Sequence, residues 1–141
     1  MNINLISLSP NKEQAQQLAL QILSNMDTVT PCDSIEMLAD SIIHSQCWAS
    51  RDDSGSIKAL VRFSVMSEEI YIFDIHVFGE KDSGTGSALM KLMTELADLL
   101  GKRFVRLRCN VKNRACGFYR KLGFQEVGQD TDLLRFQLQI R

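Results

Sequence analysis

The sequence contains few of the residues that bind metal ions. It has only two histidines, His44 and His76, and its four cysteines include no Cys-x-x-Cys pair. Protein sites for transition metals usually combine several such ligands at close spacing. We therefore expect no metal site, and the favoured interpretation of the cysteines is buried, reduced thiols.

The sequence also lacks long apolar runs and long runs of charge. No apolar stretch approaches the length of about 20 residues that a membrane-spanning helix needs. Residues 1–6 lack the charged start and the apolar core of a signal peptide. The 16 basic and 17 acidic residues give a formal net charge of −1, which creates no field toward phosphate polymers. We expect a cytoplasmic protein that binds neither membranes nor nucleic acid.

What is present fits one domain that covers residues 1–141. This length, with 45% hydrophobic residues, is enough to bury a core, and no repeat or linker interrupts the chain. Apolar residues at helical spacing predict a helix from Ser9-Pro10 to about Met26 and a second one that starts near Asp33 or Ser34.

Alternating and continuous apolar runs predict strands in the rest of the chain. They lie at 3–8, 46–49, 57–66, 70–77, 104–109 and 134–140, and one more follows Gly123. Because a helix connects the strand at 70–77 to the strand at 104–109, these two should be parallel. The prediction is an α/β domain with a mixed, mainly antiparallel sheet of six or seven strands, flanked by about four helices.

The central feature is a strand, a glycine loop and a helix. The strand at 70–77 is followed by Gly84-Thr85-Gly86, and the helix beyond it continues to about Leu100. Glycines at a helix start allow close approach of a ligand, and the N–H groups of the first turn favour a bound phosphate. The same pattern is also ordinary turn and capping chemistry, so both interpretations stay open on this segment alone.

A second segment is a short helix that contains Ala115, Phe118 and Tyr119 and ends at Gly123-Phe124. The two segments together resemble the GNAT superfamily of acyl-coenzyme A N-acyltransferases. The resemblance rests on Lys81-x-x-Gly84-x-Gly86 and on Ala115-x-x-Phe118-Tyr119-x-x-x-Gly123-Phe124, about thirty residues apart. It covers roughly residues 46–141 and implies the GNAT fold.

The resemblance also implies a binding site for acetyl-CoA, which serves as the co-substrate. In the family, the glycine loop holds the pyrophosphate, and the end of the central strand splays from its neighbour and pairs with the pantetheine arm. Lys112 stands where many members have a coenzyme-contacting Asn, which leaves open the polar residue that replaces it. The residues predicted to contact the coenzyme are Ile75, Val77, Lys81, Ser83, Gly84, Thr85, Gly86, Ser87 and Asn113.

Three residues are candidates for catalysis. Tyr119 falls on the family position whose hydroxyl lies near the coenzyme sulfur, and a phenol with a pKa of about 10 can protonate a departing thiolate. Asp74 and His76 lie two apart on the central strand, hence on one face unless a bulge intervenes, and either could accept the proton of an amine. Asp74 is the first candidate for this base and His76 the second. Each residue also has a purely structural interpretation. Tyr119 could be an aromatic residue of the core, Asp74 could bond a neighbouring loop, and His76 could be a half-buried side chain with satisfied hydrogen bonds.

The predicted function is transfer of an acetyl group from acetyl-CoA to a primary amine of a small molecule or a protein, by direct attack on the thioester. The alternative is a non-catalytic GNAT-like module that binds an acyl-CoA or a protein partner as a regulator. Asp82 beside the expected phosphates and the missing Asn favour this alternative, because a carboxylate repels a pyrophosphate. The final strand could pair across a homodimer interface, and a monomer fits equally well.

Overall fold

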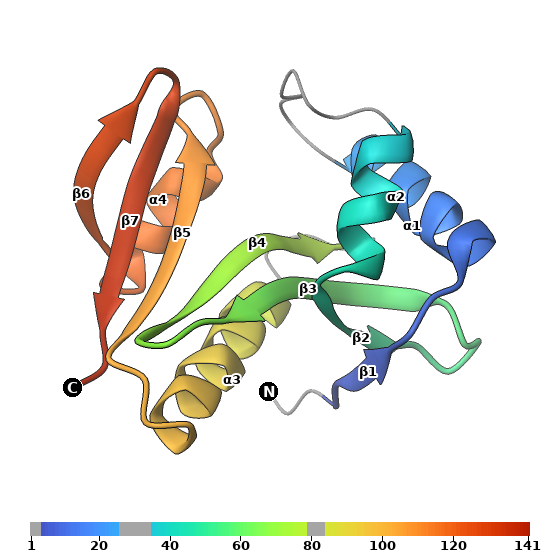
Figure 1. Ribbon diagram of the computed structural model, residues 1–141, viewed down its shortest axis with the longest axis horizontal. Helices are drawn as coiled ribbons and strands as arrows, with labels where there is room; N and C mark the ends of the chain where they lie inside the picture. Colours follow the sequence, from blue (N-terminus) through green and yellow to red (C-terminus); the bar gives the residue numbers. More distant parts are fainter. Residues whose placement is uncertain (1–3, 26–34, 79–83) are drawn as a thin grey trace.

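The computed structural model describes residues 4–25, 35–78 and 84–141, and Figure 1 draws their course. The order of the elements in the described residues is β1 (Ile6–Leu8), α1 (Lys12–Asn25), α2 (Ile35–Ile43), β2 (Gln46–Arg51), β3 (Ile57–Val65), β4 (Glu69–Val77), α3 (Thr85–Leu99), β5 (Phe104–Asn110), α4 (Ala115–Lys121), β6 (Gln125–Asp130) and β7 (Leu133–Gln139).

The strands form one sheet in the order β1-β2-β3-β4-β5-β7-β6. Only β4 and β5 pair in parallel, and all other neighbours are antiparallel. The mixed sheet of seven strands and the four helices of the described residues confirm the predicted architecture. Among these residues no helix is long and apolar enough to cross a membrane.

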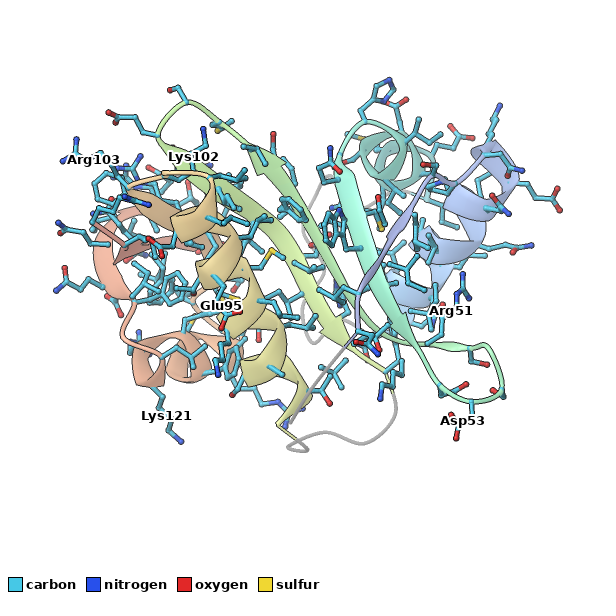
Figure 2. All side chains as sticks on the ribbon, turned by 90° about the horizontal axis from the view of Figure 1, so that it is seen from below. Arg51, Asp53, Glu95, Lys102, Arg103 and Lys121 are labelled. Carbon is cyan, nitrogen blue, oxygen red and sulfur yellow. The ribbon has the colours of Figure 1, made fainter. Side chains whose placement is uncertain are left out.

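The helices cover the two faces of the sheet. Helices α1 and α2 bury Leu18, Ile22 and Ile42 against Leu60 of β3. Helices α3 and α4 pack on the opposite face, over a larger core. Figure 2 shows α3 crossing this face with Glu95 labelled on it, while Lys102 and Arg103 lie next to each other and apart from Arg51 and Lys121.

The helix ends differ in detail from the predicted ones. Helix α3 ends at Leu99, one residue before the predicted end at about Leu100, and the Leu100 side chain is 46% exposed. The helix stops here because Gly101 adopts a left-handed conformation, with φ of 73°. Within residues 4–8, the described part of the predicted first strand, Ile6 to Leu8 pair with β2. The start predicted for the second helix lies outside the described residues.

The cysteines of the described residues are buried and form no disulfide. Cys47, Cys109 and Cys116 are all free, and burial raises the pKa of the Cys47 thiol to about 11. These three thiols confirm the interpretation of buried, reduced cysteines. Cys32 lies outside the described residues.

The parallel pair at the centre of the sheet splays apart. The ladder between β4 and β5 starts at Glu69 and Phe104 and ends at Ile72 and Leu107, although both strands continue. Figure 1 shows the two strands starting side by side and then diverging. Ile75 lies beyond the last paired residues, at the open end of the splay.

A bulge in β4 decides which side chains face α1 and α2. Arg62 pairs with Asp74, but the next residue of β3, Phe63, pairs with Ile72, so Phe73 is the extra residue. After the bulge, His76 lies opposite Leu60, which belongs to the α1 and α2 face of the sheet. Asp74 therefore shares a face with His76 despite the bulge that precedes it.

Candidate active site

The start of α3 lies close to the end of β4. Gly84 precedes the first helical residue with φ of 86°, in the left-handed region that favours glycine. Its carbonyl oxygen accepts a hydrogen bond from the Ala88 amide at 3.0 Å, so Gly84 begins the helical ladder. Thr85 is buried and Ser87 is exposed. The predicted coenzyme contacts Lys81 and Ser83 lie outside the described residues.

Gly86 has a structural reason to be glycine that the sequence did not reveal. A Cβ atom at this position would lie 3.3 Å from Cζ of Phe118 and 4.0 Å from Cγ2 of Val77. The absence of a side chain therefore allows α3 to approach α4 and the end of β4 closely. This contact joins the two motif segments in space.

Asp74 forms a buried ion pair with Arg62 of β3. The Arg62 Nε atom donates to Asp74 Oδ2 at 2.5 Å, and its Nη2 atom contacts the same oxygen. The third nitrogen, Nη1, donates to the Ser41 hydroxyl of α2 at 2.9 Å, and the Arg62 side chain is only 4% exposed. This arginine belongs to the site, but nothing in the sequence pattern singled it out.

The pKa of Asp74 is lowered by its neighbours. Burial acts to raise it, but the neighbouring His76 side chain and the charge of Arg62 outweigh burial, and the pKa falls below its usual value. Asp74 is therefore a carboxylate at neutral pH. A carboxylate with a lowered pKa is a weak base.

His76 is held on three sides and is 8% exposed. Its Nδ1 atom lies 3.4 Å from the side-chain nitrogen of Asn25, the last residue of α1. Its ring stacks on Phe78, with 6.0 Å between the ring centroids and 12° between the planes. The Nε2 atom lies 3.9 Å from Asp74 Oδ1 and has no hydrogen-bond partner among the described residues. The fold thus brings together the two predicted candidates for the base.

Glu69, at the opposite end of β4, is engaged elsewhere. Its carboxylate accepts a hydrogen bond from Arg106 of β5 at 2.9 Å, and the same arginine donates to Gln137 of β7 at 2.8 Å. Arg108 likewise faces Asp130 at 3.7 Å. The two strand arginines are therefore paired with local carboxylates.

Tyr119 lies in an aromatic cluster on the α3 and α4 face. The centroid of its ring is 5.3 Å from that of Phe118, 5.8 Å from that of Phe124 and 5.9 Å from that of Phe136. Burial, followed by the negative potential of Cys109 and Asp74, raises its pKa well above the usual value. The phenol therefore stays protonated at neutral pH and acts as a hydrogen-bond donor.

Asn113 caps the short helix α4. Its side-chain oxygen accepts a hydrogen bond from the Ala115 amide at 2.9 Å, and its backbone oxygen accepts one from the Cys116 amide at 3.1 Å. The side-chain oxygen of Asn110, three residues earlier, accepts a hydrogen bond from the Lys112 amide at 2.9 Å. Both asparagines thus stabilise the turn that follows β5.

A groove of about 390 Å³ lies beside the histidine. It is lined by the C-terminal part of α1 and by the residue that follows β4, namely Gln21, Ser24, Asn25 and Phe78. Two of these lining residues, Asn25 and Phe78, also contact the His76 ring. The groove is polar, and none of its described lining residues is charged.

The chain was compared with known families and structures. A model of the acetyltransferase (GNAT) family matches residues 17–124. A solved PaiA N-acetyltransferase from Thermoplasma acidophilum, in complex with coenzyme A, is 15% identical over 99% of each chain, with a TM-score of 0.76. The ribosomal-protein-S18-alanine N-acetyltransferase from Escherichia coli is 19% identical over 97% of this chain and 94% of its own, with a TM-score of 0.73.

A nourseothricin acetyltransferase is 27% identical over 69% of this chain and 66% of its own, with a TM-score of 0.63. A search among curated proteins gave no significant match. The likeness to the solved structures confirms the predicted GNAT fold, and the family model covers well over half of the residues. The chain belongs to the GNAT acetyltransferase family.

Proposed function

We propose that the protein is an N-acetyltransferase that moves an acetyl group from acetyl-CoA to a primary amine of a small molecule or a protein. The observation that carries this proposal is the position of the Asp74 and His76 pair on β4, next to the splay of β4 and β5. In this arrangement a thioester in the splay and an amine in the groove beside His76 would approach each other.

Acetyl-CoA fits the described residues of the splay. Ile75 and Val77 lie beyond the last residues that β4 pairs with β5, and we expect the backbone at this end of β4 to bond the pantetheine arm. We expect the first turn of α3 to bind the pyrophosphate, because the positive end of a helix dipole favours a bound phosphate. This turn contains Thr85, Gly86 and Ser87 and follows Gly84. Lys81, Ser83 and Asn113 complete the proposed set of coenzyme contacts.

The reaction needs one proton to leave the amine and one group to stabilise the departing sulfur. The amine nitrogen attacks the thioester carbonyl, a C–N bond forms, and the C–S bond breaks. His76 takes the proton of the amine, and the Asp74 carboxylate compensates the positive charge of the imidazolium. Tyr119 donates a hydrogen bond to the departing thiolate rather than the proton predicted from the sequence, because burial raises its pKa. The thiolate then takes a proton from solvent.

The geometry favours His76 over Asp74 as the proton acceptor. Both nitrogens of Arg62 that reach Asp74 bind its Oδ2 atom, so the carboxylate is already neutralised. Its Oδ1 atom is the one that faces His76. Asp74 thus orients the imidazole and compensates its positive charge, and His76 accepts the proton of the amine.

The Ser87→Glu variant tests the position of the coenzyme. We expect the affinity for acetyl-CoA to fall at least about 10-fold, because a carboxylate in the first turn of α3 repels the pyrophosphate by about 1.4 kcal/mol or more. Calorimetric titration of acetyl-CoA measures this change. The same substitution should not harm the fold, since acidic residues in a first helical turn stabilise the helix by about 0.3–1 kcal/mol.

Ser87→Ala is the matched control and should bind acetyl-CoA like the wild type. Ser87 is preferred to Gly86 for this test because any side chain at Gly86 meets Phe118. Unchanged binding by Ser87→Glu would place the coenzyme elsewhere. No binding of acetyl-CoA by the wild type at millimolar concentration would favour the regulator that binds a protein partner.

Tyr119→Phe is expected to lower kcat by about 10- to 100-fold, which corresponds to the loss of one hydrogen bond to a charged atom. The KM for acetyl-CoA should change little, because the ring keeps its aromatic contacts. Steady-state kinetics with a panel of primary amines measures both constants. Full activity of the variant would leave Tyr119 only the role of a core aromatic.

The amine itself, a cytoplasmic location and a homodimer remain predictions. Two of the similar enzymes act on a ribosomal-protein alanine and on nourseothricin, as their names state. We therefore propose an amine screen that includes peptides with free N-termini as well as small molecules.

A further inference from the structure

The contact between Asn25 and His76 links the end of α1 to the proposed base. Asn25 lines the groove, and its side-chain nitrogen lies 3.4 Å from His76 Nδ1. An amide nitrogen is a hydrogen-bond donor only, so in this contact Nδ1 accepts and carries no proton. The neutral ring then carries its proton on Nε2.

The second nitrogen of the ring favours the same tautomer. Nε2 is fully buried, lacks a hydrogen-bond partner among the described residues and faces Asp74 Oδ1 at 3.9 Å. A protonated Nε2 is attracted to this carboxylate, whereas a lone pair would be repelled by it. Contacts at opposite sides of the ring thus agree on one proton position.

Among the described residues, no other charge reverses this preference. From β4 the ring faces Asp74, and from β3 the Arg62 guanidinium acts through that carboxylate. From β2 the nearby titratable group is the Cys47 thiol, which stays neutral because burial raises its pKa to about 11. From α1, the described residues that line the groove are uncharged: Gln21, Ser24 and Asn25.

We propose that Asn25 is a positioning residue that keeps His76 Nδ1 unprotonated and directed toward the groove. When an acceptor amine binds in the groove, its N–H group would replace that of Asn25 as the donor to Nδ1. The tautomer follows from the contacts alone, and only its catalytic consequence rests on the proposed function. Nothing in the sequence pattern assigns a role to Asn25.

Nitrogen NMR of the histidines tests this proposal directly. The chain has only two histidines, so long-range proton–nitrogen spectra of labelled protein are simple, and a His44→Gln variant assigns them. In the neutral form of His76 we expect Nε2 to be protonated and Nδ1 to be unprotonated. A neutral His76 protonated at Nδ1 would overturn the proposal.

Two variants change the donor, and a third is the control. Asn25→Asp replaces the donor by an acceptor, so His76 should become protonated at Nδ1 at neutral pH. Asn25→Leu removes the donor and should lower the fraction of the Nε2-protonated tautomer. Gln21→Leu removes an amide from the same groove without touching the ring and should leave the spectrum unchanged. An Asn25→Asp protein whose Nδ1 stays unprotonated would contradict the proposal.

The kinetic measurement separates this inference from the proposed function. In an active enzyme, Asn25→Leu should lower kcat about 10-fold, while the KM for acetyl-CoA stays within twofold of the wild type. If the wild type acetylates no amine but the NMR results hold, the proposed function fails and the positioning role stands. If the wild type is active and the tautomer differs, only the positioning role fails.

Discussion

His76→Gln lowers kcat by about 10²- to 10⁴-fold, the range typical of a lost general base. Glutamine is close to histidine in size and keeps polar atoms, but it cannot take a proton from an amine at neutral pH. The binding of acetyl-CoA should remain, since the predicted coenzyme contacts do not involve this side chain. Steady-state kinetics and calorimetric titration of the same preparation measure the two effects.

His44→Gln is the matched control for this experiment. His44 is exposed and contacts only the α2 residue Asp40 among the interactions described, with 2.8 Å between its Nδ1 and the Asp40 carbonyl oxygen. This variant should keep the wild-type kcat. The Asp74→Asn variant separates the two candidates for the base. If Asp74→Asn loses more of the wild-type kcat and His76→Gln keeps nearly all of it, the proton transfer belongs to Asp74.

Arg62→Met is expected to lower the free energy of unfolding by about 3–5 kcal/mol at pH 7, because it leaves the Asp74 carboxylate buried without its partner. Methionine retains much of the apolar contact of the arginine stem, so the lost charge dominates the effect. Urea unfolding followed by circular dichroism measures the change. For comparison, an ordinary surface substitution changes stability by at most about 0.5 kcal/mol.

The double variant Arg62→Met with Asp74→Asn tests the cause of this destabilisation. It removes both charges, so it should be more stable than Arg62→Met alone. If the two single effects simply add, the ion pair is not what holds Arg62 in place.

The effect of Arg62→Met also depends on pH. Asp74 has a folded pKa below its unfolded value of about 3.9, so its contribution is complete above that value and is lost as pH falls through the folded pKa. In the variant, burial without a cation favours the neutral acid, which removes the penalty at low pH. The difference in unfolding free energy between wild type and Arg62→Met should therefore shrink below about pH 4. A difference that is constant from pH 7 to pH 3 would contradict this explanation.

The fold was largely predictable because its evidence is local. Apolar spacing along the chain marks the helices and strands. The left-handed backbone conformation before α3 is one that glycine adopts readily, and Gly84 stands there. The order of the two motif segments then predicted the fold that the similar structures confirm. The least accurate parts were the element ends, such as the exposed Leu100, where tertiary contacts decide how far a regular pattern continues.

The sequence by itself determined the element types, the parallel central pair and the family, because periodicity, turn chemistry and motif order are properties of neighbouring residues. Only the tertiary structure decided what Asp74 and His76 touch. Arg62 is twelve residues from Asp74 and Asn25 is 51 residues from His76, and both contacts depend on strand register and on a bulge at Phe73. Such contacts depend on packing across the sheet, which a linear pattern does not record.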